Sequence, residues 1–326
     1  MITNYGVSII VPTFKQNKDF LEMAIASAIN QTFWLNANSG SGEIIVIEDG
    51  LSDYDYFSNF TSIARNLNLE FIKSHNNDDD KNNIQIFSFS KNNREHIIKF
   101  ILKENNGGTA SALNTGIKYS SPEFKYFSWL SSDDFFYPDF LEMHFNAIEN
   151  SQSRISYSGY SEMVYDKNGN LLSEQRYRPV ILEDINYPYH MSKQLSIDRK
   201  DFKTSLSNDL YNGSCRYNGC CFVFEKSIFD EVGLFNEDYK FVQDFSMWLS
   251  ISNDVNIKNI ALLPQSLMSR REHKGRTQFL YSQEDFLKQK KWEMSDMFYK
   301  FIDIHMPNMI INNDNNINNN NIVKEQ

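Results

Sequence analysis

Short apolar runs alternate with segments of helical spacing in the first half of the chain. Val7–Val11 is a run rich in β-branched residues, and Glu43–Ile47 is a second, largely apolar run. Between them, Asp19–Gln31 carries apolar residues at helical spacing, which predicts a helix. Apolar strands that alternate with helices favour a parallel sheet covered on both faces. The pattern therefore predicts an α/β fold.

The same periodicity predicts most of the remaining elements. Further strands are expected at Leu69–Ile72, Ile84–Phe89, Ile97–Leu102, Phe124–Leu130 and Phe222–Phe224, and further helices at Tyr54–Leu67, Thr109–Lys118, Phe140–Asn150, Phe241–Ile251 and Glu284–Ile304. The polar stretch Asn76–Asn83 favours a hairpin, and its triplet Asp78–Asp80 lacks the spacing of an EF-hand loop. Residues 151–218 give no clear assignment. Asn312–Asn321 is a low-complexity tail that we expect to be disordered.

Composition and charge narrow the function classes. Hydrophobic residues make up 41% of the 326 residues, enough for a sizeable core. The formal net charge of -10 argues against unspecific nucleic-acid binding, which needs a basic face, but it leaves room for a small anionic ligand. Neither a membrane-spanning apolar stretch nor a secretory signal pattern is apparent, so we expect a cytoplasmic protein, with peripheral docking on a membrane left open. Cys215, Cys220 and Cys221 are expected to be reduced thiols.

Polar residues follow three of the predicted strands where each one ends. These strand ends are Pro12–Phe14, Glu48–Gly50 and Ser131–Asp134. In an open parallel sheet such ends converge on one crevice, where ligands bind. Carboxylates crowded there repel one another, and a divalent cation relieves the repulsion. Because Mg²⁺ is commonly held by one or two carboxylates together with substrate phosphates, a nucleotide diphosphate suits such a site.

Several segments, taken in order, resemble the family 2 glycosyltransferases. The matching segments are Ser8–Phe14, Val46–Asp53, Asn106–Ile117, Trp129–Pro138, Gly219–Phe235 with Gln243–Leu249, and Arg271–His273. The resemblance implies a GT-A fold, which is a Rossmann-like, mostly parallel sheet flanked by helices. It also implies inverting transfer of a sugar from a nucleotide-sugar, most simply a UDP-sugar, to a hydroxyl of a glycan, glycoprotein or glycolipid acceptor.

The resemblance assigns donor contacts to particular residues. Asp49 is expected to hydrogen-bond the nucleotide base, with Pro12, Thr13 and Phe14 lining the base site. The remaining residues expected to contact the donor are Asn106, Gly107, Gly108, Ser132, Asp133 and Arg271.

Metal binding and catalysis are assigned in the same way. Asp133 is expected to bind Mn²⁺ or Mg²⁺, with Asp134 as its neighbour or alternative and His273 as a further ligand or phosphate contact. Asp244 is expected to be the general base. The sequence departs from the family pattern at Ser131, where the family has an Asp, and at Gln243, where it has a Glu. Neither residue brings a charge, so metal or donor affinity is in question.

Each of these residues also has an ordinary structural interpretation. Asp133–Asp134 could cap a helix or form a turn, and Asp244 could complement a helix dipole in a first turn. Asn106–Gly108 could be a turn, because glycine adopts unusual backbone angles at little cost. His273 could lie in an exposed loop. The basic cluster Arg270, Arg271, Lys274 and Arg276 could contact a diphosphate or be solvated.

The expected organisation is one GT-A domain over residues 1–264, with a nucleotide-binding half to about residue 135 and an acceptor half after it. A loop and helical extension over residues 265–306 and a tail over residues 307–326 follow. The stripe Leu287, Met294, Phe298 and Phe301 predicts packing of this helix on the domain, with docking of a partner or homo-oligomer as the alternative. Two other functions stay open: a non-catalytic nucleotide- or sugar-binding homologue, and a sugar-phosphate nucleotidyltransferase.

Overall fold

The computed structural model describes residues 6–35, 40–50, 56–76, 82–165, 171–184, 186, 193–273 and 282–305. The aspartate triplet Asp78–Asp80, the basic residues Lys274 and Arg276 and the asparagine-rich tail lie outside these ranges. Within them, no helix is both long enough and apolar enough to cross a membrane.

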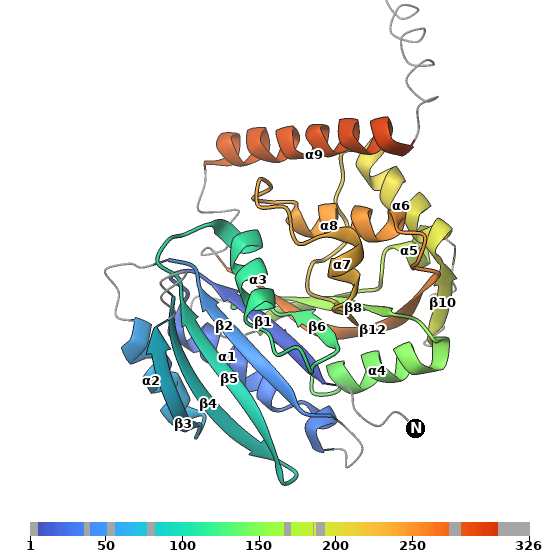
Figure 1. Cartoon of the computed structure of the whole chain (residues 1–326). Helices are drawn as coiled ribbons and strands as arrows, with labels where there is room; N and C mark the ends of the chain where they lie inside the picture. Colours follow the sequence, from blue (N-terminus) through green and yellow to red (C-terminus); the bar gives the residue numbers. More distant parts are fainter. Residues whose placement is uncertain are drawn as a thin grey trace, which may run out of the picture.

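One sheet of twelve strands runs through the described part of the chain (Figure 1). The strands are β1 (Val7–Thr13), β2 (Gly42–Glu48), β3 (Glu70–Asn76), β4 (Asn83–Lys91), β5 (Arg94–Leu102), β6 (Tyr126–Trp129), β7 (Phe135–Phe136), β8 (Ile155–Tyr165), β9 (Leu171–Tyr177), β10 (Leu195–Asp198), β11 (Phe222–Glu225) and β12 (Asn259–Glu272). They lie in the order β10-β12-β8-β11-β6-β1-β2-β5-β4-β3, with β7 paired to β12 and β9 to β8. The central strands β6, β1, β2 and β5 are parallel, which confirms the expected α/β sheet. Antiparallel β11 and β4 flank this centre.

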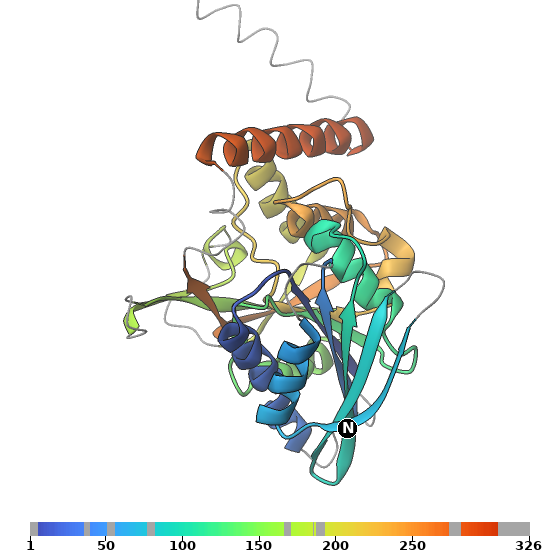
Figure 2. The ribbon, with the colours of Figure 1, turned by 90° about the vertical axis from the view of Figure 1, so that its left-hand side faces the viewer.

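Helices cover both faces of the sheet (Figures 1 and 2). They are α1 (Lys18–Ile29), α2 (Tyr56–Asn66), α3 (Gly108–Lys118), α4 (Phe140–Ser151), α5 (Ile181–Asp184), α6 (Arg199–Tyr211), α7 (Ile228–Val232), α8 (Gln243–Asn253) and α9 (Gln283–His305), with a 3-10 turn at Thr32–Leu35. The crossovers from β1 through α1 to β2 and from β5 through α3 to β6 run in opposite directions along the sheet. Right-handed connections therefore place α1 and α3 on opposite faces.

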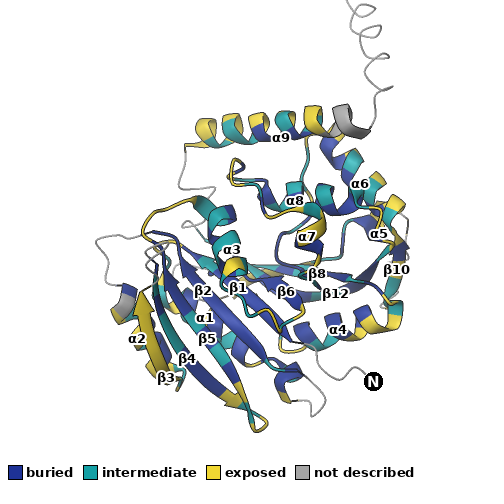
Figure 3. Cartoon of the chain, in the orientation of Figure 1, coloured by how far each residue is buried: buried dark blue, intermediate teal, exposed yellow. Residues whose placement is uncertain are grey.

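The core follows from the apolar strand runs. Strands β2 and β6 are buried along their whole length and β1 at every residue except Pro12, as the dark blue in Figure 3 shows, whereas β3 is exposed at the sheet edge. Helix α1 begins where Asn17 accepts hydrogen bonds from the backbone N–H groups of Asp19 and Phe20, at 2.8 and 3.3 Å. Such a side-chain cap satisfies donors that the first helical turn leaves unpaired.

The region without a clear sequence assignment, residues 151–218, adds strands and two helices in its described parts. They are β8, β9, α5, β10 and α6. Strand β12 pairs parallel to β8 and runs from Asn259 to Glu272, so the domain boundary expected at residue 264 falls inside a strand. The sheet therefore continues to the end of β12.

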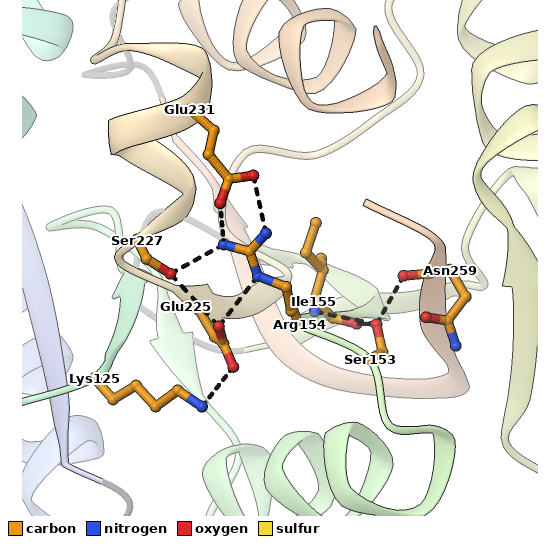
Figure 4. A network of polar contacts seen from close by, with 8 residues as sticks. All are labelled: Lys125, Ser153, Arg154, Ile155, Glu225, Ser227, Glu231 and Asn259. Carbon is orange, nitrogen blue, oxygen red and sulfur yellow. Dashed lines mark hydrogen bonds and ion pairs between the residues drawn. The ribbon is translucent and has the colours of Figure 1, made fainter. Parts of the chain in front are cut away.

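A network around Arg154 joins the start of β8 to β11 and α7 (Figure 4). The Arg154 guanidinium donates to Glu225 at 3.1 Å and to both carboxylate oxygens of Glu231 at 2.7 and 2.9 Å. Lys125, just before β6, pairs with Glu225 at 2.6 Å. Beside it, Ser153 donates to the backbone carbonyl of Asn259 at 2.8 Å. These bonds fix the mutual position of β6, β8, β11 and β12 on the side of the sheet away from the polar strand ends.

Helix α9 lies across the end of the domain that α6 and α8 form (Figures 1 and 2). Glu293 fastens it: this side chain is 0% exposed, and its carboxylate accepts hydrogen bonds from the backbone N–H groups of Lys240 and Phe241, at 2.8 and 3.0 Å. Asp296 adds a bond from the Tyr239 hydroxyl at 2.7 Å. Residues 239–241 directly precede α8, so α9 supports the start of that helix. The predicted packing of this helix on the main domain agrees with these contacts.

We predict that Glu293→Ala lowers the free energy of unfolding by about 1–3 kcal/mol, because two partly buried backbone N–H groups lose their acceptor. Urea-induced unfolding followed by circular dichroism measures this change. Glu284→Ala is the matched control, since Glu284 is an exposed glutamate at the start of the same helix. Equal stability of the two variants would contradict the role given to Glu293.

Candidate active site

A cavity of about 730 Å³ opens at the carboxyl ends of the parallel strands. The backbone N–H of Asp49 donates to the Thr13 carbonyl at 2.8 Å, and that of Leu130 donates to the Ile10 carbonyl at 3.0 Å. The ends of β1, β2 and β6 are thereby held side by side, as the sequence predicted. The lining includes Pro12, Thr13, Phe14, Asp49, Asn106, Gly108, Trp129, Ser131, Ser132, Asp133, Asp134, Gly219, Lys240, Gln243, Asp244, Arg270, Phe286 and Lys290.

The loop after β1 forms one wall of the cavity. Phe14 is 43% exposed there, whereas Thr13 is buried. Lys15 has a positive φ of 50°, and its backbone N–H donates to the Glu48 carboxyl at 3.0 Å. Burial raises the pKa of Glu48 to about 7. This bond from the end of β2 sets the course of the loop, so that Pro12, Thr13 and Phe14 all line the cavity.

Asp49 lines the cavity with its carboxylate already engaged by the protein. It forms an ion pair with Lys103 and accepts hydrogen bonds from the backbone N–H groups of Gly107, at 3.1 Å, and Gly108, at 2.6 Å. The two N–H groups belong to the start of α3, where an acid also suits the helix dipole. Asp49 thus anchors α3 to the sheet. Lys103, whose role the sequence did not suggest, neutralises the carboxylate.

Two glycines, one after β2 and one at the start of α3, have positive φ angles, and close approach of the chain also requires the first. Gly50 has a φ of 115°, and a Cβ there would lie 2.6 Å from the backbone nitrogen of Asn106. Gly108 has a φ of 85°, in the region that favours glycine. The turn expected at Asn106–Gly108 and its expected place beside the strand ends are therefore compatible. Asn106 and Gly108 line the cavity, and Gly107 does not.

Asp133, which lines the cavity, contacts His273, which does not line it, although 140 residues separate them. The Nε2 atom of His273 lies 2.8 Å from Oδ2 of Asp133, and each side chain is 16% exposed. The ring of Phe20 packs edge-on against the imidazole, with centroids 5.0 Å apart. His273 directly follows β12, whose pairing with β7 brings it to this position. A carboxylate and an imidazole at this spacing are ligand types that divalent manganese accepts.

The other residues expected at the metal have different partners. Asp134 is buried, and its Oδ1 accepts a hydrogen bond from the backbone N–H of Arg271 at 2.9 Å. Within the described residues, no group of three or more His, Cys, Asp and Glu side chains is arranged to hold an ion. The structure therefore offers a pair, Asp133 and His273, in place of the expected set of three.

Arg271 does not line the cavity. Its side chain is 4% exposed, and the guanidinium lies over the ring of Phe20 at 4.2 Å and near that of Tyr165 at 5.6 Å. Its neighbour Arg270 lines the cavity instead. Successive side chains on a strand point to opposite faces, so a shift by one residue exchanges the exposed arginine for the packed one. Arg271, which the resemblance assigns to the donor, is therefore the packed arginine, and Arg270 is the one at the cavity.

Asp244 lines the cavity from the first turn of α8. Its Oδ1 accepts a hydrogen bond from the backbone N–H of Phe245 at 2.8 Å. Loss of solvent around the carboxylate raises its pKa to about 6, while the nearby Lys290 ammonium opposes the rise. A carboxylate with a pKa near neutrality is well suited to accept a proton.

Comparison with known proteins identifies the family. The sequence profile of the family described as "Glycosyl transferase family 2" matches residues 58–233, which is more than half of the chain. This chain belongs to glycosyl transferase family 2. The resemblance that the motifs suggested is confirmed.

Bacterial relatives carry the same designation. An uncharacterized glycosyltransferase of Rickettsia bellii is 30% identical over 247 residues, which is 75% of this chain and 27% of that protein. The uncharacterized glycosyltransferase RP339 of Rickettsia prowazekii is 27% identical over 276 residues, covering 83% of this chain and 65% of the relative. This chain thus spans only part of the length of these relatives.

Solved structures agree on the fold. The crystal structure of residues 1–349 of S. aureus TarS in complex with UDP-GlcNAc aligns with a TM-score of 0.52 at 15% identity, covering 94% of this chain and 74% of that one. The expected GT-A-type architecture is confirmed.

Four buried polar atoms of residues that line the cavity have no hydrogen-bond partner among the described residues. They are Oγ1 of Thr13, Nε1 of Trp129, Oε1 of Gln243 and Nε of Arg270. An unpaired buried polar group costs about 1–3 kcal/mol. Their convergence on one space indicates a hydroxyl-rich or amide-bearing ligand that supplies the missing partners.

The two departures from the family pattern have local explanations. Ser131 lies 3.1 Å from the sulfur of buried Cys220, so a small neutral side chain fits where the family carries an aspartate. Gln243 is buried at the start of α8 beside Asp244.

Ser132 accepts a hydrogen bond from Gln16 at 3.3 Å, which ties the end of β6 to the loop after β1.

Gly219 separates Trp129 from Asp244. A Cβ at residue 219 would lie 2.7 Å from the Trp129 ring and 2.8 Å from Oδ2 of Asp244. Both distances are shorter than real carbon contacts, so one of the two side chains would have to move. Glycine is therefore needed here for close approach, and no sequence pattern indicated it.

We predict that Gly219→Ala slows sugar transfer by roughly 10- to 100-fold, because a displacement of the Asp244 carboxylate of about 1 Å is enough for such a loss. Turnover measured alongside the melting temperature separates this effect from unfolding. Full activity in a stably folded Gly219→Ala protein would show that the position of Asp244 is not critical.

Proposed function

We propose that this chain transfers a sugar from a nucleotide-sugar, preferably a UDP-sugar, to a hydroxyl acceptor with inversion at the anomeric carbon. The observation that carries the proposal is the meeting, in one cavity, of the β1 loop, Asp133 with His273 as its partner, and Asp244 with its raised pKa. Family membership supports glycosyl transfer as the reaction.

The donor lies along the strand ends in this proposal. The exposed ring of Phe14 offers a face on which a nucleotide base can stack, and Pro12 and Thr13 complete the base site. Asp49 contributes by fixing the loop of Asn106, Gly107 and Gly108, and its engaged carboxylate limits how directly it reads the base. UDP-GlcNAc bound to the TarS fragment is consistent with a UDP-sugar as the donor class.

Mn²⁺ or Mg²⁺ fits the pair formed by Asp133 and His273. Two protein ligands leave coordination positions for the oxygens of a diphosphate, as is usual for such ions at phosphate sites. When bound, the ion neutralises charge that develops on the departing nucleotide diphosphate. Asp134 holds β12 through the Arg271 backbone, and Arg270 supplies a further positive charge at the cavity.

Asp244 acts as the general base. The acceptor oxygen attacks the anomeric carbon as its proton passes to the Asp244 carboxylate, and the bond between that carbon and the phosphate oxygen breaks to release the nucleotide diphosphate. A single in-line displacement of this kind inverts the configuration. The unpaired groups of Trp129 and Gln243 lie where they can hydrogen-bond sugar hydroxyls.

We predict metal-dependent release of UDP from one of a panel of UDP-, GDP- and dTDP-sugars, even without an acceptor. Asp133→Ala is expected to reduce this release by about 100-fold, because the diphosphate loses its charge compensation. Asp139→Ala is the matched control, since Asp139 is exposed and does not line the cavity. A protein that binds UDP but neither hydrolyses nor transfers any of these sugars would instead be a binding homologue.

We predict that kcat/KM for transfer rises about tenfold per pH unit below pH 6 and levels off above it, since Asp244 accepts a proton only when it is ionised. Asp244→Asn is expected to lower transfer by about 10²–10⁴-fold and to abolish this limb. Asp238→Asn, an exposed position close by in the chain, serves as control. A profile without a limb near pH 6 would exclude Asp244 as the base.

A further inference from the structure

Two lysines line the cavity close to the base, and the described residues supply neither with a side-chain partner. Lys240 lies three residues before the start of α8, and Lys290 belongs to α9. No described residue forms an ion pair or a side-chain hydrogen bond with either ammonium group. Lys99 and Lys103, by contrast, each pair with a carboxylate. Positive charges that line a cavity without internal partners favour an anionic ligand.

The lysines belong to the acceptor side of the cavity. The charge of Lys290 opposes the rise that burial causes in the pKa values of the Asp244 carboxyl and the Cys215 thiol, so Lys290 lies near the base. Phe241 and Phe286 line the cavity beside them, with ring centroids 4.7 Å apart. The combination is a small subsite of two ammonium groups and two aromatic rings next to the proposed proton acceptor.

One contact brings the two lysines together. Glu293 lies three residues after Lys290 on α9, so the two side chains share one side of the helix. The Glu293 carboxylate accepts the backbone N–H groups of Lys240 and Phe241 and a bond from Gln289 at 2.9 Å. The negative charge of Glu293 is thus stabilised by hydrogen-bond donors of the protein. The bond that docks α9 also sets the spacing of the subsite.

We propose that Lys240 and Lys290 bind an anionic group of the acceptor, a phosphate or a carboxylate, so that the substrate that receives the sugar is a negatively charged hydroxyl compound. This inference rests on the proposed transferase function. In the proposed function the donor diphosphate is held by Arg270 and by an ion at Asp133 and His273, which leaves these two lysines for the second substrate. The acidic protein would otherwise repel such an acceptor, since its net charge is -10.

The test measures acceptor-site binding with the donor site filled. Protein saturated with UDP and Mn²⁺ is titrated by calorimetry with glycerol 3-phosphate, glycerate and glycerol, up to about 10 mM. We expect one or both anionic compounds to bind and glycerol not to bind. The Lys240→Ala/Lys290→Ala protein is expected to bind them about tenfold more weakly, Lys290→Arg to retain binding, and Lys288→Ala, an exposed lysine on the same helix, to match wild type.

Every other outcome contradicts either the proposed function or the inference about the acceptor. Failure of wild-type protein to bind UDP would remove the proposed function and this inference with it. Normal UDP binding without binding of either anion, or equal anion binding by wild type and the double variant, would refute the inference alone. Anion binding that UDP abolishes would assign the lysines to the donor diphosphate. UDP affinity measured on each variant shows whether its cavity is intact. If the double variant does not bind UDP, Lys290→Arg still tests whether a positive charge at residue 290 is needed for anion binding.

Discussion

Four carboxylates gather at one edge of the sheet, and the site depends on how their mutual repulsion is relieved. They are Asp49, Asp133, Asp134 and Asp244. Parallel pairing of β1 with β2 and β6 makes the crowding unavoidable, because it brings the strand ends together. Lys103 neutralises Asp49, the backbone of β12 engages Asp134, and His273 lies against Asp133. Acids held in this way serve as structural anchors, and in the proposed function Asp133 with His273 would also bind an ion.

The surroundings of Asp244 differ from those of the other three carboxylates. No described side chain forms an ion pair with it, and burial raises its pKa to about 6. The different surroundings of Asp244 and Asp133 thus suit them to different roles. A cavity that both binds a diphosphate and accepts a proton needs two such carboxylates. Helix α9 belongs to this arrangement, because Glu293 supports the segment before α8 and places Lys290 at the cavity. The C-terminal helix is therefore part of the site.

Sequence patterns located the central strands, most helices and the donor-side motifs, because apolar periodicity and strand-end chemistry are local. They missed features that depend on distant partners. The sequence around Lys103 does not indicate an ion pair with Asp49, and the sequence around Lys290 does not indicate that this residue lines the cavity. Arg270 and Arg271 could not be told apart without the register of β12. Residues 151–218 gave no assignment, since their strands take their order from pairing with β11 and β12.

A crystal structure with UDP and Mn²⁺ tests the central claim most directly. The account predicts the uracil against Phe14 and Thr13, the ion in contact with Asp133 and His273, and open space between the diphosphate and Asp244 for sugar and acceptor. UDP bound outside this cavity, or within it but with its diphosphate away from the Asp133–His273 pair, would contradict the account.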